Sequence, residues 1–444
     1  MPRPTSVKLV RAILAVLVLL SVMAVPRASF AYSVLTHEQI VDLLWKDQIR
    51  PLLLARFPGA GEEDLRKAHA YAYGGCVVQD MGYYPFGSQF FSNLVHYVRS
   101  GDFVLALLQE SSDINEYAFA LGALSHYSSD NSGHPTINRV VAVTFPKLRA
   151  KYGDQVTYAD SPKAHIRTEF GFDLVQVAKN RYTSDSYHDF VGFQVSKPLL
   201  ERAFAKTYGM KLEDVLGHTD LAIGTFRRAV SKVVPEMTRV ALLSRRLDFV
   251  KDTPNASERK FLYYLSRNEY EKEWGTIYRK PGFKTRILAF ILRLIPKIGP
   301  FKALAFEIPT TQTEDMYVKS VDKTVENYAG LLREVGSDNL HWPNTDCDTG
   351  RPPRAGEYVL SDKTYARLLH TLSDQGLDQL TPELREDILA FYATAAAPSA
   401  TKKDRKAWLR TLNELDELKA EPPRAVPTPT SGSGESESTS TDAR

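Results

Sequence analysis

The chain has 444 residues, of which 43% are hydrophobic and 25% charged, the composition of an ordinary soluble protein. That length is enough for a sizeable core and for more than one domain. The formal net charge is +3 at pH 7, but residues 1–31 contain four basic and no acidic side chains, so the rest of the chain carries −1. The charge therefore excludes a strongly basic protein, and we expect no stable nucleic-acid complex.

Residues 1–31 have the pattern of a secretory signal peptide. Basic residues occupy positions 3, 8 and 11, residues 12–25 are almost all apolar, and Ser29 and Ala31 are the small residues of a cleavage site. A retained membrane anchor is the alternative, but the apolar run is shorter than the roughly 20 residues that a spanning helix needs. We predict cleavage after Ala31, a mature chain that begins at Tyr32, and export to the periplasm or the extracellular space.

The mature chain is predicted to be all-α, because apolar residues recur every three to four positions and sustained alternation is scarce. Thr36 and Gln39 have the form of a capping box, which places His37 in the first turn of a helix. A second helix is predicted over 114–129, after an Asp113 cap. Gly122 in that helix would let a neighbouring helix approach closely.

A third helix is predicted to begin at Pro162, which is favoured at the first helical position. Further helical patterns follow, one ending near Gly209 and another running over 212–247. The composition then changes, so we place a domain boundary near residue 250. Residues 251–420 are predicted to form an additional C-terminal helical region of unknown role, interrupted by a loop over 343–356.

Two other segments have distinctive compositions. Residues 284–306 combine apolar and basic residues, which fits either a helix that lies on an anionic membrane surface or a buried core helix. Residues 421–444 are rich in Pro, Ser, Thr, Gly and Glu and are predicted to be a disordered tail. The two cysteines, Cys76 and Cys347, are compatible with a disulfide or with separate buried thiols.

Metal-ligand residue types are concentrated in the first part of the mature chain. His126 and Asp130 are four residues apart, so both point from one helix face, and His165 and Glu169 repeat that spacing. A break over 131–133 would turn the next histidine toward a second ion. A single pair of this kind is more often a surface or core pair, but the combination predicts a polynuclear zinc site. The full set is His37, Asp80, His96, His126, Asp130, His134, His165 and Glu169.

The order of these residues, counted from an aromatic Tyr32, resembles the zinc-dependent phospholipase C superfamily, which also contains the fungal single-strand nucleases. The similarity covers about residues 32–250, which would form the catalytic domain. The resemblance implies three zinc ions: one held by Asp80, His96, His126 and Asp130; a second held by His134, His165 and Glu169; and a third held by the Tyr32 amine and carbonyl, His37 and Asp130.

The chain departs from the family pattern in three respects. The family usually begins with tryptophan rather than Tyr32. His134 follows Asp130 by four residues instead of six. Leu35, Met81 and Asn93 stand where the bacterial phospholipases have a choline pocket, which leaves a preference for phosphatidylcholine unsupported.

The resemblance implies an exported zinc-dependent phosphodiester hydrolase, above all a phospholipase C that acts on phospholipids. Asp80 and Asp130 are the predicted catalytic residues, and Asp80 would orient or deprotonate the attacking water. The alternatives are a nuclease-like phosphodiesterase with another phosphodiester substrate, and a non-catalytic exported helical binding protein. Peripheral membrane contact through 284–306 would fit a lipid substrate.

Overall fold

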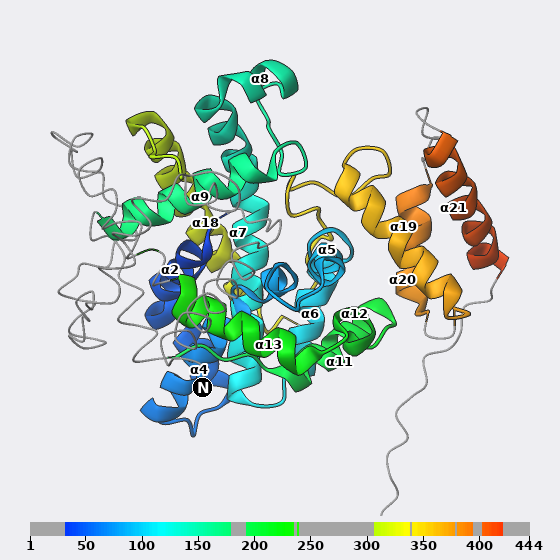
Figure 1. Ribbon diagram of the computed structural model, residues 1–444. Helices are drawn as coiled ribbons and strands as arrows, with labels where there is room; N and C mark the ends of the chain where they lie inside the picture. The colour runs from blue at the N-terminus through cyan, green and yellow to red at the C-terminus, as the bar shows by residue number, and fades with distance from the viewer. Residues whose placement is uncertain are drawn as a thin grey trace, which may run out of the picture.

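The computed structural model describes residues 32–178, 192–234, 238, 306–337, 340–377, 380–393 and 402–420. These residues form helices and loops without a β-strand, so the predicted all-α fold is confirmed (Figure 1). The elements are α2 (Val34–Leu44), the π-helix η1 (Trp45–Ile49), α3 (Arg50–Arg56), α4 (Glu62–Gly75), the 3₁₀ helix η2 (Val78–Tyr83), α5 (Gln89–Tyr97), α6 (Ser100–Glu110), α7 (Ile114–Thr144), α8 (Pro146–Tyr152), α9 (Pro162–Ala178), α11 (Lys197–Tyr208), α12 (Leu212–Leu216), α13 (Thr219–Arg228), the π-helix η3 (Ala229–Val233), α18 (Thr311–Glu334), α19 (Val359–Asp374), α20 (Pro382–Tyr392) and α21 (Lys402–Ala420).

The long helix α7 runs through the middle of the molecule and packs most extensively against α4 and α18 (Figure 1). Its first turn is capped by Asp113, whose carboxylate accepts the backbone N–H groups of Asn115 and Glu116. Gly122 faces α4 so closely that a β-carbon would lie 2.1 Å from the carbonyl oxygen of Ala72. The predicted close approach at Gly122 is therefore confirmed.

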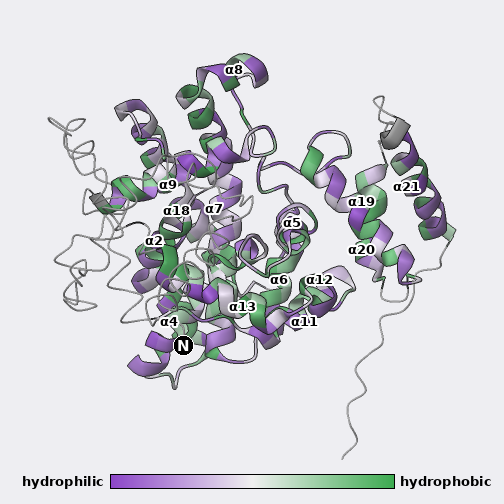
Figure 2. Cartoon of the chain, viewed as in Figure 1, coloured by the Kyte–Doolittle hydropathy of each residue, from purple (hydrophilic) through white to green (hydrophobic). Residues whose placement is uncertain are grey.

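Residues beyond 305 contribute to the same core. Tyr328 on α18 donates a hydrogen bond to the carbonyl oxygen of Leu121 on α7 (2.9 Å), and Tyr317 stacks on Phe172 of α9 with ring centroids 4.2 Å apart. α19 packs against α5 and α21. Figure 2 shows that the outer helices α8 and α21 are mainly hydrophilic, whereas α6 is mainly hydrophobic.

Three local predictions were wrong. The break expected over 131–133 does not exist, because α7 continues through it to Thr144. Thr36 does not cap α2, since the helix begins at Val34 and the Thr36 hydroxyl bonds instead to Asp173. The helix expected over 212–247 is interrupted at Gly217, whose φ of +73° ends α12.

Other predictions have a simpler outcome. α9 begins at Pro162 and α11 ends before Gly209, as expected. Cys76 and Cys347 are free, buried thiols. The predicted signal peptide, the 284–306 segment up to residue 305, the tail after residue 420 and the boundary near residue 250 lie outside the described residues. Among the helices that the structure describes, none has the length and apolar character needed to cross a bilayer.

Candidate metal centre

One face of α7 forms the base of the candidate metal centre. His126, Asp130 and His134 follow one another at intervals of four residues, so their side chains leave the helix on the same side. All three are fully buried. The predicted break was expected to turn His134 toward a second ion. In the continuous helix, His134 lies one turn beyond Asp130 on the same face, so no break is needed to separate it from His126.

The first group of candidate ligands combines three elements. Asp80 lies in η2, His96 on α5 and His126 on α7, and one potential ligand atom of each lies within 4.8 Å of the others. His96 Nε2 and His126 Nε2 are 3.2 Å apart, and each is 3.2 Å from Asp130 Oδ2. Two ligands of one tetrahedral zinc ion are separated by about 3.3 Å. These atoms therefore have the spacing of a coordination shell.

Backbone carbonyls fix the orientation of three imidazole rings. The Nδ1 atoms of His96 and His126 lie 2.7 Å and 2.9 Å from the carbonyl oxygens of Ser92 and Cys76. His165 is turned the other way, with Nε2 2.7 Å from the Val156 carbonyl oxygen. A proton on the nitrogen that faces the carbonyl leaves the other nitrogen with a lone pair for a metal ion.

The second group lies on the other side of Asp130. His134 on α7 and His165 and Glu169 on α9 bring one potential ligand atom each to within 4.8 Å of the others. His165 Nδ1 is 3.1 Å from Glu169 Oε1. His134 Nε2 is 3.7 Å from Asp130 Oδ2, which links the two groups through one carboxylate.

The third group is built by the start of the described chain. His37 on α2 stacks on His126 with ring centroids 4.4 Å apart, and His37 Nε2 is 3.7 Å from Asp130 Oδ1. Tyr32 lies beside them, with its ring centroid 6.1 Å from that of His37. Its hydroxyl group forms a hydrogen bond with Ser320 of α18 (2.6 Å), which anchors the first described residue to the core.

Many polar atoms of the centre have no hydrogen-bond partner among the described residues. They include both carboxylate oxygens of Asp80 and Asp130, both ring nitrogens of His37 and His134, and Glu169 Oε2. Each unsatisfied buried group costs about 1–3 kcal/mol. Imidazole and carboxylate ligands are the donor set that zinc prefers, so divalent cations fit this site.

The electrostatics of the centre also favour bound cations. Burial, reinforced by the negative charges of Asp130 and Glu169, raises the pKa of Asp80 well above its ordinary value. Burial likewise raises the pKa of Glu169. Burial acts in the same direction on Asp130, but His126 and its neighbours outweigh it and hold the pKa of Asp130 well below its usual range. A cation between these carboxylates would stabilise all of them in the ionised form.

The structure adds one residue that the sequence analysis missed. Asp348, in the loop before α19, is fully buried, and its Oδ1 atom is 3.2 Å from His134 Nε2. No spacing pattern marks Asp348 as a ligand, because it lies 179 residues after Glu169. Two other histidines pair with carboxylates of their own: His69 with Asp42 (3.0 Å), and His370 with Glu414.

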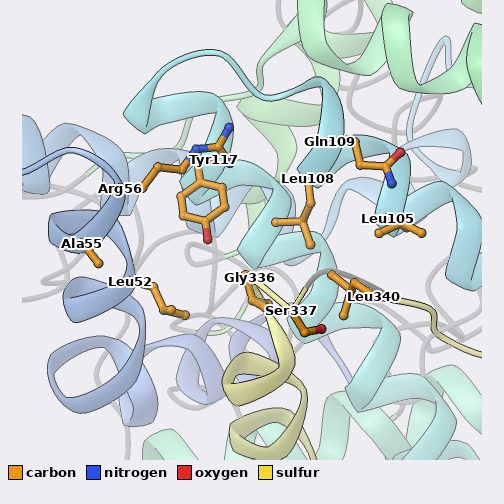
Figure 3. A pocket seen from close by; sticks show the side chains of 11 residues that line it. Leu52, Ala55, Arg56, Leu105, Leu108, Gln109, Tyr117, Gly336, Ser337 and Leu340 are labelled. Carbon is orange, nitrogen blue, oxygen red and sulfur yellow. The ribbon is translucent and has the colours of Figure 1, made fainter.

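A surface pocket lies elsewhere. It has a volume of about 810 Å³ and is lined by residues of α3, α6, the start of α7 and the segment after α18, among them Arg56, Leu108, Tyr117 and Leu340 (Figure 3). Tyr117 precedes His126 by nine residues, which corresponds to about 13 Å along α7. The pocket is therefore separate from the candidate ligands.

Together, the described residues form an all-helical fold with three adjoining groups of buried side chains that could each hold a metal ion. Residues 36–215 match the family model of zinc dependent phospholipase C, so this part of the chain is similar to that family. All eight candidate side chains lie within the matched residues. No curated protein and no solved structure gave a match. The family is one of zinc-dependent hydrolases.

Proposed function

We propose that the mature chain is an exported zinc-dependent phosphodiester hydrolase with three zinc ions, and that phospholipids are its substrates. The family match supports a phospholipase C-like activity. The observation that carries the proposal is the position of Asp130, whose Oδ2 atom faces His96, His126 and His134 while its Oδ1 atom faces His37. A carboxylate in this position can join neighbouring ions.

In this proposal the ligands are assigned as follows. The first ion is held by Asp80, His96, His126 and Asp130; the second by His134, His165 and Glu169; and the third by His37, Asp130 and the amine and carbonyl of Tyr32. The third site requires cleavage after Ala31, because a peptide nitrogen cannot replace a free amine as a ligand. The burial of Tyr32 and its hydrogen bond to Ser320 support a defined position for this terminus.

Clustered zinc lowers the pKa of bound water and neutralises the charge of a phosphodiester and its leaving group. The protein side chains would position the ions and the attacking water. The Asp80 carboxylate lies 3.6 Å from His96 Nε2 and has two oxygens without a hydrogen bond, so one is available to orient or deprotonate the attacking water. Asp130, assigned to both the first and the third ion, would fix the distance between these two sites.

Among the described residues, the side chains at positions 35 and 81 do not form a choline pocket. Leu35 and Met81 are buried apolar side chains, and neither offers an acidic group to a quaternary ammonium. Binding of such a cation is favoured by aromatic faces and carboxylates. We therefore propose a broader or different head-group preference than phosphatidylcholine alone.

The test uses mature protein with Tyr32 at the amino terminus, confirmed by mass. Zinc content is measured, and turnover is compared for phospholipid vesicles, a soluble p-nitrophenyl phosphodiester and single-stranded DNA, each with and without a chelator. Zinc-dependent release of a phosphorylated head group supports the proposal. Preferential cleavage of DNA would indicate the nuclease alternative, and a zinc-loaded protein that hydrolyses none of the three would indicate a binding protein.

A further inference from the structure

Residues 343–351, here called the acidic loop, reach the metal centre from outside the part of the chain that matches the family. The backbone N–H of Cys347 donates a hydrogen bond to the carbonyl oxygen of His96 (3.1 Å). The side-chain amide of Asn138 on α7 donates to the carbonyl oxygen of Asp348 (3.2 Å). The loop is thus fastened both to a candidate ligand and to the helix that carries three others.

α7 has a local feature that fits this loop. Pro135 lies inside the helix and has no N–H to offer the carbonyl of Asn131. Gly350 approaches that carbonyl so closely that a β-carbon would lie 2.8 Å from its oxygen, and its φ of +68° suits glycine. The Asn131 side chain accepts a hydrogen bond from Thr345 (2.6 Å). The proline, the glycine and these contacts fix where the loop meets α7.

The Asp348 carboxylate is held in one orientation. Its Oδ2 atom accepts hydrogen bonds from the hydroxyl groups of Tyr97 (2.8 Å) and Tyr358. Its Oδ1 atom lies 3.2 Å from His134 Nε2 without forming a hydrogen bond. Two tyrosines therefore occupy one oxygen and direct the other toward the second group of ligands. Outer hydrogen bonds of this kind orient metal ligands.

The ring nitrogen of His134 that lies next to Asp348 indicates whether Asp348 would bind the metal ion itself or only orient His134. A carboxylate that merely orients a metal-bound histidine accepts a hydrogen bond from the ring nitrogen opposite the metal. Asp348 instead lies beside Nε2, the nitrogen of His134 that also faces Asp130. The 3.2 Å separation without hydrogen-bond geometry is close to the roughly 3.3 Å expected between two ligands of one tetrahedral ion.

We propose that Asp348 is the fourth protein ligand of the ion held by His134, His165 and Glu169. The inference rests on the proposed zinc centre and extends it: four protein ligands are typical of zinc that is firmly held, whereas three leave an open position. In this protein the region after residue 305 thus completes the metal centre. Asp348 also brings a fourth carboxylate to balance the charge of three divalent ions, besides Asp80, Asp130 and Glu169.

The test measures zinc binding rather than turnover. Asp348→Asn is compared with Asp387→Asn, a matched control, because Asp387 is partly buried, also accepts a tyrosine hydroxyl (Tyr365, 2.9 Å) and lies on α20. Metal-free mature protein is titrated with zinc against a chromophoric chelator, and the visible spectrum of the cobalt-substituted protein is recorded. We expect Asp348→Asn to bind one of the three ions at least about 100-fold more weakly and to alter the cobalt spectrum. Asp387→Asn should match the wild type.

A second pair of variants keeps the test decisive if Asp348→Asn does not fold. Tyr358→Phe removes one hydroxyl from Asp348 Oδ2, and Tyr365→Phe is its control. We expect about 10-fold weaker binding of one ion in Tyr358→Phe alone. Wild-type zinc affinity and cobalt spectrum in Asp348→Asn, or in Tyr358→Phe if Asp348→Asn is unfolded, would overturn this inference. A wild-type protein that binds fewer than two ions would instead overturn the proposed function.

Discussion

The aromatic ring of Tyr32 lies directly on Gly133 of α7, between the candidate ligands Asp130 and His134. A β-carbon at Gly133 would come within 2.6 Å of the Tyr32 ring, which cannot move freely because its hydroxyl is bonded to Ser320. The first described residue, Tyr32, can therefore take this position because Gly133 of the central helix has no side chain.

This contact predicts the effect of Gly133→Ala. Alanine favours a helix by about 1 kcal/mol, but the clash with the Tyr32 ring costs about 1–3 kcal/mol. We expect no gain in stability and displacement of Tyr32, so that the zinc content falls from three ions to two. Metal analysis and thermal unfolding of the purified variant measure both effects.

Gly330→Ala is the matched control, because Gly330 also lies inside a helix, α18, and its β-carbon would meet only Arg333 at an ordinary 3.7 Å. This variant should keep three zinc ions and gain up to about 1 kcal/mol in stability. Full zinc content in Gly133→Ala would show that the Tyr32 contact does not control the third site.

Removal of a ligand of the first ion is expected to have a larger effect. His126→Ala deletes a side chain that faces Asp80, His96, His37 and Asp130, so zinc loading and phosphodiester hydrolysis should be lost together. The loss of hydrolysis should exceed the roughly 10- to 100-fold that follows removal of an outer hydrogen-bond partner. His341→Ala, at an exposed position, is the control. Retention of hydrolysis in a zinc-free His126→Ala protein would contradict the proposed mechanism.

Spacing within helices made much of this centre predictable. Pairs four residues apart, such as His126 with Asp130 and His165 with Glu169, must share a helix face wherever a helix forms. Gly122 showed where two helices would approach closely. These features are local, so the sequence pattern contains them.

The continuity of α7 could not be predicted in the same way. Asn131, Gly133 and Pro135 each disfavour a helix interior, and together they resemble a helix end. In the structure, packing against α4 and α18 outweighs these local preferences, and Gly133 is required by the contact with Tyr32. Asp348 was missed for a different reason: only the tertiary fold brings the loop before α19 to His134.

The proposed free amino terminus at Tyr32 leads to another prediction. Protein that begins at Tyr32 should hold three zinc ions, whereas protein that retains residues before Tyr32 should hold two, because an amide nitrogen is not a ligand at neutral pH. Intact mass and zinc content of the two forms provide the comparison. His37 and Asp130 are present in both forms, so an equal zinc content would remove the Tyr32 amine from the third site without affecting the other two.

A last prediction concerns stability and pH, away from the metal centre. Burial raises the pKa of Asp387 from 3.8 to about 6 in the folded protein. The folded state therefore binds the proton more tightly than the unfolded state does. The resulting contribution to stability is complete below pH 4 and is lost as the pH rises to 6. A shift of two pKa units corresponds to about 3 kcal/mol.

Asp387→Asn should remove this dependence while its amide oxygen still accepts the Tyr365 hydroxyl. The variant should be more stable than the wild type at pH 7, by up to about 3 kcal/mol, and the difference should shrink as the pH falls to 4. Chemical unfolding of metal-free protein at several pH values measures it. A difference that stays constant between pH 4 and pH 7 would mean that Asp387 does not titrate in this range, and that its burial is compensated by charges such as Arg99.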